Sequence, residues 1–283
     1  MKISDSHTDF MTSIDSRDKR EKYISTICGK VKNLCCAIFT TNKNFSVEDI
    51  INFKKEIDYL QGKYKINLLF SLEDIGFIKN EEELYRIVSL RPFSVTLTWN
   101  NSNQFAGGAH TDKGLTKLGR RCVRILETNG ILVDTAHLSR RAFWEFSKIT
   151  IFPIFNSHSN IFSLKRHKRN LTDKQIERIV ISGGYVGLTL YDEFVGRTKG
   201  DSMKIVEQFD YLVQRFGDKC FGFGTDLYGI EEENLPIDIK KYHDFYLIEK
   251  TMINLGFNKK LINKIFFKNF EKLLKIGEKT NKN

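Results

Sequence analysis

The chain has 283 residues, of which 41% are hydrophobic and 28% are charged, the balance of a soluble protein with a large core. Its formal net charge of +10 is spread along the chain, so we expect a solvated basic surface and no nucleic-acid partner. No apolar run approaches the roughly 18 residues of a membrane span, and the polar N-terminus has no hydrophobic signal segment. We therefore expect a cytoplasmic protein without a membrane partner.

Short β-rich runs alternate with longer helical patterns along the whole chain. Several of the runs are continuously apolar, as strands buried on both faces should be. The eight strand candidates are Lys2–Ser6, Cys35–Thr40, Ile66–Leu72, Phe93–Thr98, Ile131–Thr135, Phe152–Asn156, Tyr185–Leu190 and Cys220–Thr225. This alternation predicts an α/β fold, a TIM-type (β/α)8 barrel, with a doubly wound open sheet as the main alternative. With only three prolines and no Gly/Ser/Pro-rich linker, we expect a single domain over residues 1–283.

The helical patterns carry start and stop signals. Ser46 to Asp49 and Thr172 to Gln175 have the spacing of capping boxes, Thr116 can cap a helix that ends before Gly130, and an apolar stripe ends at Gly217. The basic tail from Lys259 to Lys282 is expected to form an amphipathic helix. Its apolar positions are Ile262, Ile265, Phe266, Phe270 and Leu273.

The five cysteines are odd in number and form no CxxC pair. Cys35, Cys36 and Cys220 lie in apolar, strand-like surroundings, where a free thiol behaves as a small hydrophobic side chain. Reduced thiols therefore fit the sequence better than disulfides or a structural zinc site.

Residues with metal-binding side chains follow the strand candidates. His7 and Asp9 stand two apart after the first strand, so in an extended segment both can reach one ion. Glu73 ends the third strand, where we expect its carboxylate to be exposed at the barrel mouth and able to bridge two cations. His137 and His158 follow the fifth and sixth strands. A parallel barrel gathers such positions at one face.

Three histidines and two carboxylates suit zinc or a similar first-row metal. Because five ligands exceed the need of one catalytic zinc, two metals that share a carboxylate and a bridging water are the economical inference. Such a pair would make the water a nucleophile near neutral pH. Asp226, after the eighth strand, could move a proton from this nucleophile to a leaving amine. Arg169, in a basic segment after the sixth strand, could hold a substrate carboxylate with its bidentate fork.

These residues, in this order, resemble the membrane dipeptidase (renal dipeptidase) family of metallopeptidases, within the amidohydrolase-like barrels. The resemblance covers nearly the whole chain. Its motifs are Asp5-Ser6-His7-Thr8-Asp9, Leu72-Glu73, Thr96-Leu97-Thr98-Trp99-Asn100, Gly114-Leu115-Thr116-x-x-Gly119, Val133-Asp134-x-x-His137-Leu138-Ser139, Ser157-His158-Ser159, Arg169-Asn170-Leu171-x-Asp173 and Gly222-Phe223-Gly224-x-Asp226.

The resemblance implies hydrolysis of the peptide bond of a dipeptide by a zinc-bridging hydroxide. His7 and Asp9 would bind one zinc, Glu73 would bridge, and His137 and His158 would bind the second. Three further roles are implied in substrate binding and proton transfer. Arg169, with help from Tyr191, would take the C-terminal carboxylate, and Asp226 would shuttle the proton near the amino end. Dimerisation is an expectation from the family.

One motif departs from the family pattern. Well-known members carry a histidine after the fourth strand that contacts the substrate carbonyl region, whereas this chain has Trp99 followed by Asn100. The indole N–H or the Asn100 amide could still donate to an oxyanion, but neither is a cationic donor. This departure motivates one alternative to the dipeptidase hypothesis, an amidohydrolase of the same fold that acts on another small amide, lactam or lactone. A non-catalytic metal-binding barrel is a separate, third hypothesis.

Overall fold

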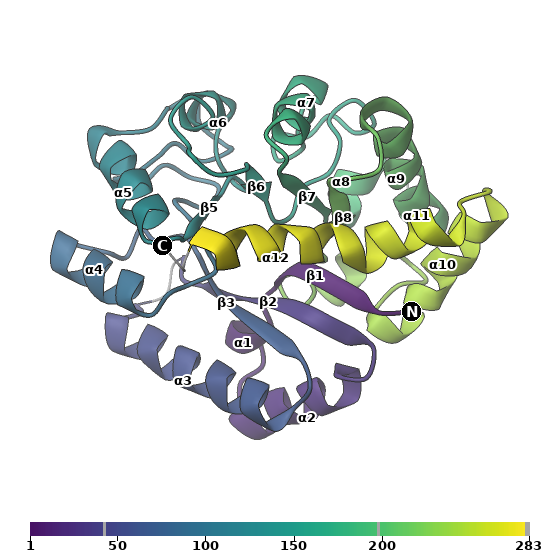
Figure 1. The fold of residues 1–283 in the computed structure, drawn as a ribbon, viewed down its shortest axis with the longest axis horizontal. Helices are drawn as coiled ribbons and strands as arrows, with labels where there is room; N and C mark the ends of the chain where they lie inside the picture. Colours follow the sequence, from purple (N-terminus) through teal and green to yellow (C-terminus); the bar gives the residue numbers. More distant parts are fainter. Residues whose placement is uncertain (42–43, 197–198, 281–283) are drawn as a thin grey trace.

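The computed structural model describes residues 1–41, 44–196 and 199–280, with the side chains of its last helix described through residue 275. Parallel strands β1 to β8 pair in chain order and close into a barrel (Figure 1), which confirms the predicted fold and all eight predicted strands. They are β1 (Ile3–Thr8), β2 (Val31–Phe39), β3 (Asn67–Glu73), β4 (Ser94–Thr96), β5 (Leu132–Asp134), β6 (Phe155–Asn156), β7 (Tyr185–Leu188) and β8 (Phe221–Phe223).

The strands differ greatly in length. β2 and β3 pair in unbroken register from Asn33 with Asn67 to Phe39 with Glu73, whereas β5 meets β6 through the pair Asp134 with Phe155. Several strands are therefore shorter than predicted. After β4, for example, the Leu97 carbonyl accepts a hydrogen bond from the Asn103 side chain at 2.7 Å. Hydrogen bonds from loop residues replace those between strands at such positions. The strands therefore end, and the loops that carry the site residues begin, earlier in the sequence than predicted.

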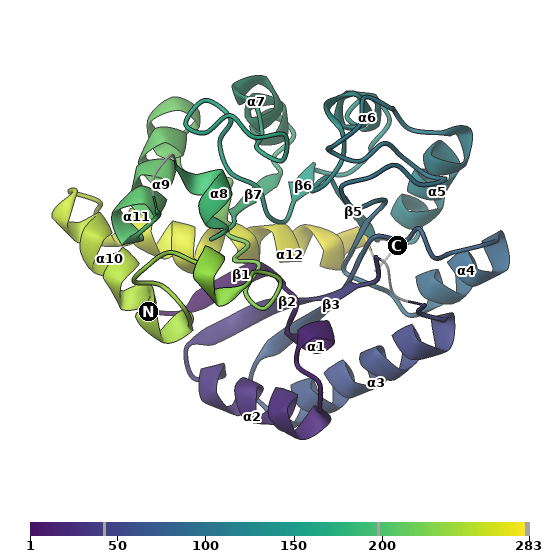
Figure 2. The same ribbon diagram turned by 180° about the vertical axis from the view of Figure 1, so that it is seen from behind.

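Helices surround the strands (Figures 1 and 2). They are α1 (Phe10–Ser13), α2 (Arg17–Ile27), α3 (Val47–Lys63), α4 (Glu81–Ser89), α5 (Lys117–Thr128), α6 (Arg140–Phe146), α7 (Asp173–Ile181), α8 (Asp192–Val195), α9 (Ser202–Phe216), α10 (Phe245–Asn254), α11 (Lys259–Asn263) and α12 (Asn269–Thr280). Both predicted capping boxes are present, at the N-termini of α3 and α7. Gly130 and Gly217 adopt the positive φ angles, 77° and 82°, that suit glycine after a helix.

The C-terminal segment closes one end of the barrel. It is divided into α11, a π-helical turn (Lys264–Lys268) and α12, rather than the one helix that was predicted, and Lys282 of the predicted tail lies outside the described residues. The predicted apolar stripe is buried, and the Phe270 ring lies 5.2 Å from that of Tyr185 at the start of β7. Figure 1 shows α12 crossing this face, and Figure 2 shows the opposite face with α1 and α8.

All five cysteines are free. Burial raises the pKa of Cys35 in β2 to about 12, which keeps this thiol protonated.

Among the described helices, none combines the length and the apolar composition needed to cross a bilayer.

Candidate metal centre

The carboxyl ends of the strands bring the predicted ligands into one cluster. His7 lies within β1 and Asp9 directly follows the strand, Glu73 is the last residue of β3, and His137 and His158 lie in the loops after β5 and β6. All five side chains are buried. Asp9 no longer has the extended backbone conformation that the sequence predicted for it. The two side chains nevertheless meet, with His7 Nε2 and Asp9 Oδ2 3.5 Å apart.

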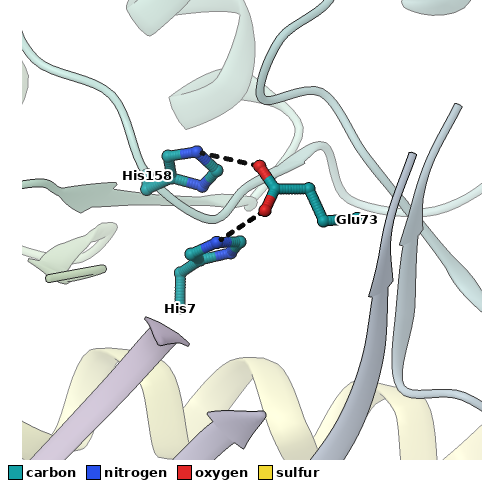
Figure 3. Close-up of side chains that lie close together, drawn as sticks. All are labelled: His7, Glu73 and His158. Atoms are coloured by element: carbon teal, nitrogen blue, oxygen red, sulfur yellow. Dashed lines mark ion pairs between the residues drawn. The ribbon is translucent and has the colours of Figure 1, made fainter. Parts of the chain in front are cut away.

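Glu73 lies at the middle of the cluster. Its Oε1 is 2.8 Å from His137 Nε2 and 3.7 Å from His158 Nε2, while its Oε2 is 3.4 Å from His7 Nε2. Figure 3 shows His7 and His158 directed at different oxygens of this carboxylate. The expectation of an exposed Glu73 was wrong, because the histidines of three other segments cover the carboxylate and leave the residue 3% exposed.

A second group of donors adjoins the first through His7. Asp226 Oδ1 lies 3.8 Å from His7 Nε2, and one ligand atom from each of His7, Asp9 and Asp226 lies within 4.8 Å of the others. His7, Asp9 and Asp226 can hold a cation between them, as can His7, Glu73 and His158. His7 therefore stands between two potential ion positions.

The backbone at the centre is held in uncommon conformations. His137 and Asp226 have φ angles of 67° and 61°, in the left-handed region that non-glycine residues rarely adopt. Gly229 packs against the carboxylates, and a Cβ there would lie 2.3 Å from Asp9 Oδ2 and 2.4 Å from Asp226 Oδ1. Such local strain is frequent at functional sites, where the surrounding structure enforces it.

A buried carboxylate beneath the centre fixes the first and last strand ends together. Asp5 accepts hydrogen bonds from the backbone N–H of His7 at 3.1 Å and of Thr225 at 2.9 Å, and from the Tyr242 hydroxyl. Because Thr225 precedes Asp226, this carboxylate ties the two segments that carry the second group of donors.

The electrostatic potential of the cluster suits a cation. Burial lowers the pKa of His7, but the charges of Glu73 and Asp9 outweigh burial and raise this pKa well above its ordinary value. Burial and the charge of Asp9 raise the pKa of Asp226 well above the ordinary aspartate value. The pKa of His158 is lowered well below its ordinary value, first by burial and then by the charge of His7. Strong negative potential at His7, with neutral imidazole at His158, is what a metal site requires.

Two buried polar atoms at the centre support this interpretation directly. His7 Nε2 and Asp9 Oδ1 have no hydrogen-bond partner among the described residues, although buried polar atoms are normally satisfied. Imidazole nitrogens and carboxylate oxygens are together the donor set that favours Zn, Mn, Fe or Co. The residues present therefore fit a first-row metal.

The centre opens into a cleft of about 700 Å³ that Arg169, Tyr191, Trp99 and Asn100 all line. Arg169 is 5% exposed, and its Nη2 donates to the His158 carbonyl at 3.3 Å and lies 3.0 Å from His137 Nε2. The Trp99 ring lies 5.9 Å from the ring of His137. The predicted substrate-binding residues thus share one cavity with the centre, and its volume suits a small ligand.

Several residues at this site were not predicted from the sequence. Phe194 and Glu231 line the cleft, and the Phe194 ring lies 5.7 Å from the Arg169 guanidinium. Asn100 was expected to face the substrate, but its Oδ1 lies 2.9 Å from His137 Nδ1 and so also contacts the histidine. Ser157 contacts two histidines. Its position next to His158 in the sequence was the one available signal, whereas Phe194 and Glu231 have no motif around them.

Two proteins of known sequence are similar to parts of this chain. A relative from Schizosaccharomyces pombe, described as an uncharacterized dipeptidase, is 31% identical over 169 residues, which are 56% of this chain and 41% of that protein. An uncharacterized protein from the pqqA 5′ region of Klebsiella pneumoniae is 28% identical over 213 residues, 71% of this chain and 78% of that protein.

A solved structure has the same fold. The metallopeptidase from Rhodobacter sphaeroides, in complex with a phosphinate mimic of the dipeptide L-Ala-D-Ala, superposes with a TM-score of 0.84 at 19% identity, over 97% of this chain and 99% of that chain. The sequence profile of membrane dipeptidase, peptidase family M19, matches residues 30–283. The chain therefore belongs to the membrane dipeptidase family, a family of metal-dependent hydrolases that act on peptide bonds.

Proposed function

We propose that this protein is a zinc-dependent dipeptidase with a dinuclear centre. The position of Glu73 carries the proposal, because its two oxygens face two different histidines, His137 and His7. Nε2 of His7 has no hydrogen-bond partner among the described residues, although it is buried. His7 and Asp9 would hold one zinc, His137 and His158 the other, and Glu73 would bridge them. When bound, the two ions would supply an activated water and polarise the scissile carbonyl.

The residues of the cleft define how a dipeptide would lie. Arg169 is buried and cationic, so it would take the C-terminal carboxylate at one end, with Tyr191 nearby. Asp226 lies beside the second group of donors, where it would accept the proton of the attacking water and deliver it to the leaving amine. A free amino terminus would lie near this acidic end. A substrate that pairs with both Arg169 and Asp226 within this one cleft would be a short peptide.

Trp99 favours one alternative. An indole lines the cleft where the family pattern has histidine, so the carbonyl region of the substrate meets a neutral, bulky side chain. A small amide, lactam or lactone that needs no cationic donor at this position is the second candidate substrate class.

A substrate panel tests the proposal. Purified protein should hydrolyse dipeptides but not the matched tripeptides or N-acetyl dipeptides, and a chelator should abolish the activity until zinc is returned. Glu73→Gln should be inactive in the same assay while it retains its secondary structure. Chelator-resistant cleavage, or equal cleavage of blocked dipeptides, would contradict the proposal. Cleavage of lactams or lactones in place of dipeptides would select the alternative.

A further inference from the structure

A single buried hydroxyl lies between two of the histidines of the centre. Ser157 Oγ is 2.7 Å from His158 Nδ1 and 3.4 Å from His7 Nδ1. The two imidazole rings are close neighbours, with centroids 3.8 Å apart, and their Nε2 atoms both face Glu73 (Figure 3). Ser157 is 1% exposed, so water does not compete for these contacts.

The direction of these two hydrogen bonds follows from the ring nitrogens that face the centre. The segment that carries this hydroxyl is held by the buried Asp134 carboxylate, which accepts a hydrogen bond from the Ser157 backbone N–H at 3.0 Å. A hydroxyl has one proton and two lone pairs. A neutral histidine that binds a metal through Nε2 has its proton on Nδ1, so in the zinc-loaded protein the lone pairs of the Ser157 hydroxyl would accept from Nδ1–H of His7 and of His158.

This arrangement has a consequence for both imidazoles. A neutral imidazole that donates from Nδ1 has its lone pair on Nε2, and the Nε2 atoms of His7 and His158 are those that face the carboxylates of the centre. We propose that Ser157, held by Asp134, is a positioning residue that sets the same tautomer in His7 and His158. One hydroxyl thereby prepares a ligand for each of the two metal positions. This inference rests on the dinuclear centre of the proposed function.

The remaining histidine has a separate partner, which makes the role of Ser157 distinct. His137 Nδ1 lies 2.9 Å from Asn100 Oδ1, so its tautomer is set from the loop after β4. The outer hydrogen bonds of metal-bound histidines typically contribute 10- to 100-fold to metal affinity. Loss of the Ser157 hydroxyl should therefore weaken two sites, whereas loss of the Asn100 amide should weaken one.

Zinc titration of matched serine variants tests the inference. Ser157→Ala removes the shared hydroxyl. Ser159→Ala is the control, because Ser159 flanks His158 on the other side, is equally buried, and its Oγ has no hydrogen-bond partner among the described residues. Chelator competition with Zn²⁺ should show both dissociation constants of Ser157→Ala raised by about 10- to 100-fold, with Ser159→Ala unchanged. Unchanged affinity in Ser157→Ala, or a loss at only one position, would overturn the inference.

A spectroscopic measurement on the wild-type chain gives an independent test, including the case in which Ser157→Ala does not fold. In ¹⁵N-histidine spectra of the zinc-loaded protein, His7, His137 and His158 should each have a protonated Nδ1 and a metal-bound Nε2. The signals of the three histidines outside the centre, His110, His167 and His243, are identified by replacing each of them in turn with Gln. An Nε2–H signal from His7 or His158 would overturn the inference. If wild-type protein bound no zinc, the proposed function would be wrong. If it bound zinc but showed such an Nε2–H signal, only the inference about Ser157 would be wrong.

Discussion

Replacement of Arg169 by Ala should remove the recognition of the substrate carboxylate. Burial lowers the pKa of Arg169 to about 10, so the guanidinium is still a cation at neutral pH. Hydrogen bonds to a charged group contribute about 1.5–3 kcal/mol net. At about 1.4 kcal/mol per tenfold change, Arg169→Ala should raise KM for a dipeptide by about 10- to 150-fold.

The assay compares two enzymes with two substrates. Wild type and Arg169→Ala are each given a dipeptide with a free C-terminal carboxylate and the same dipeptide as its C-terminal amide. If Arg169 contacts the carboxylate, either change alone should cause the full loss, and both together should cause little more. Arg166→Ala, which removes an exposed arginine of the same loop, is the control and should leave KM unchanged.

If the two losses multiply, Arg169 and the substrate carboxylate do not interact, and the role given to Arg169 is wrong. Zinc content must be measured in parallel, since Arg169 Nη2 also lies 3.0 Å from His137 Nε2. A variant that loses zinc would show that Arg169 supports the centre rather than the substrate.

Three further predictions address other parts of the molecule. Trp99→His should raise kcat/KM for dipeptides relative to other amides, as a side-by-side substrate panel would show; an unchanged preference would contradict the role given to Trp99. Because burial and Asp9 raise the pKa of Asp226, and only the ionised carboxylate can accept a proton, kcat should fall as pH falls at a pH above the ordinary aspartate range. Asp226→Asn should lower kcat by about 10²- to 10⁴-fold, and a pH profile that survives in this variant would exclude Asp226. Phe270→Ala, at the closed end of the barrel, should reduce the free energy of unfolding in urea by about 3–5 kcal/mol without changing zinc affinity; a loss below about 1 kcal/mol would show that α12 does not contribute to the core.

The strands were predictable because a parallel barrel buries both faces of each strand, which leaves continuous apolar runs such as Ile66–Leu72. Their ends were not predictable, because a ladder stops where loop groups compete for its hydrogen bonds. Asn103, which bonds the Leu97 carbonyl, acts from six residues further along the chain. The division of the C-terminal helix was missed for a similar reason, since the spacing of apolar residues does not reveal a π-helical turn.

The grouping of the metal-binding residues was predictable because topology alone places strand ends at one face. The environment of each was not. Glu73 was expected to be exposed, since its position at a strand end does not show that His7, His137 and His158 cover it. The contacts of Ser157 join segments 150 residues apart, and only the folded structure shows them.

Metal stoichiometry tests the dinuclear centre most directly. Mass spectrometry of purified wild type should find about two zinc ions per chain, as the five predicted protein ligands imply, with dipeptide cleavage that follows zinc content during stepwise removal. Glu73→Gln, which keeps the shape of the bridge but removes its charge, should bind less zinc and lose cleavage. One zinc per chain with full activity would contradict the dinuclear centre, and full activity in protein free of metal would contradict the account as a whole.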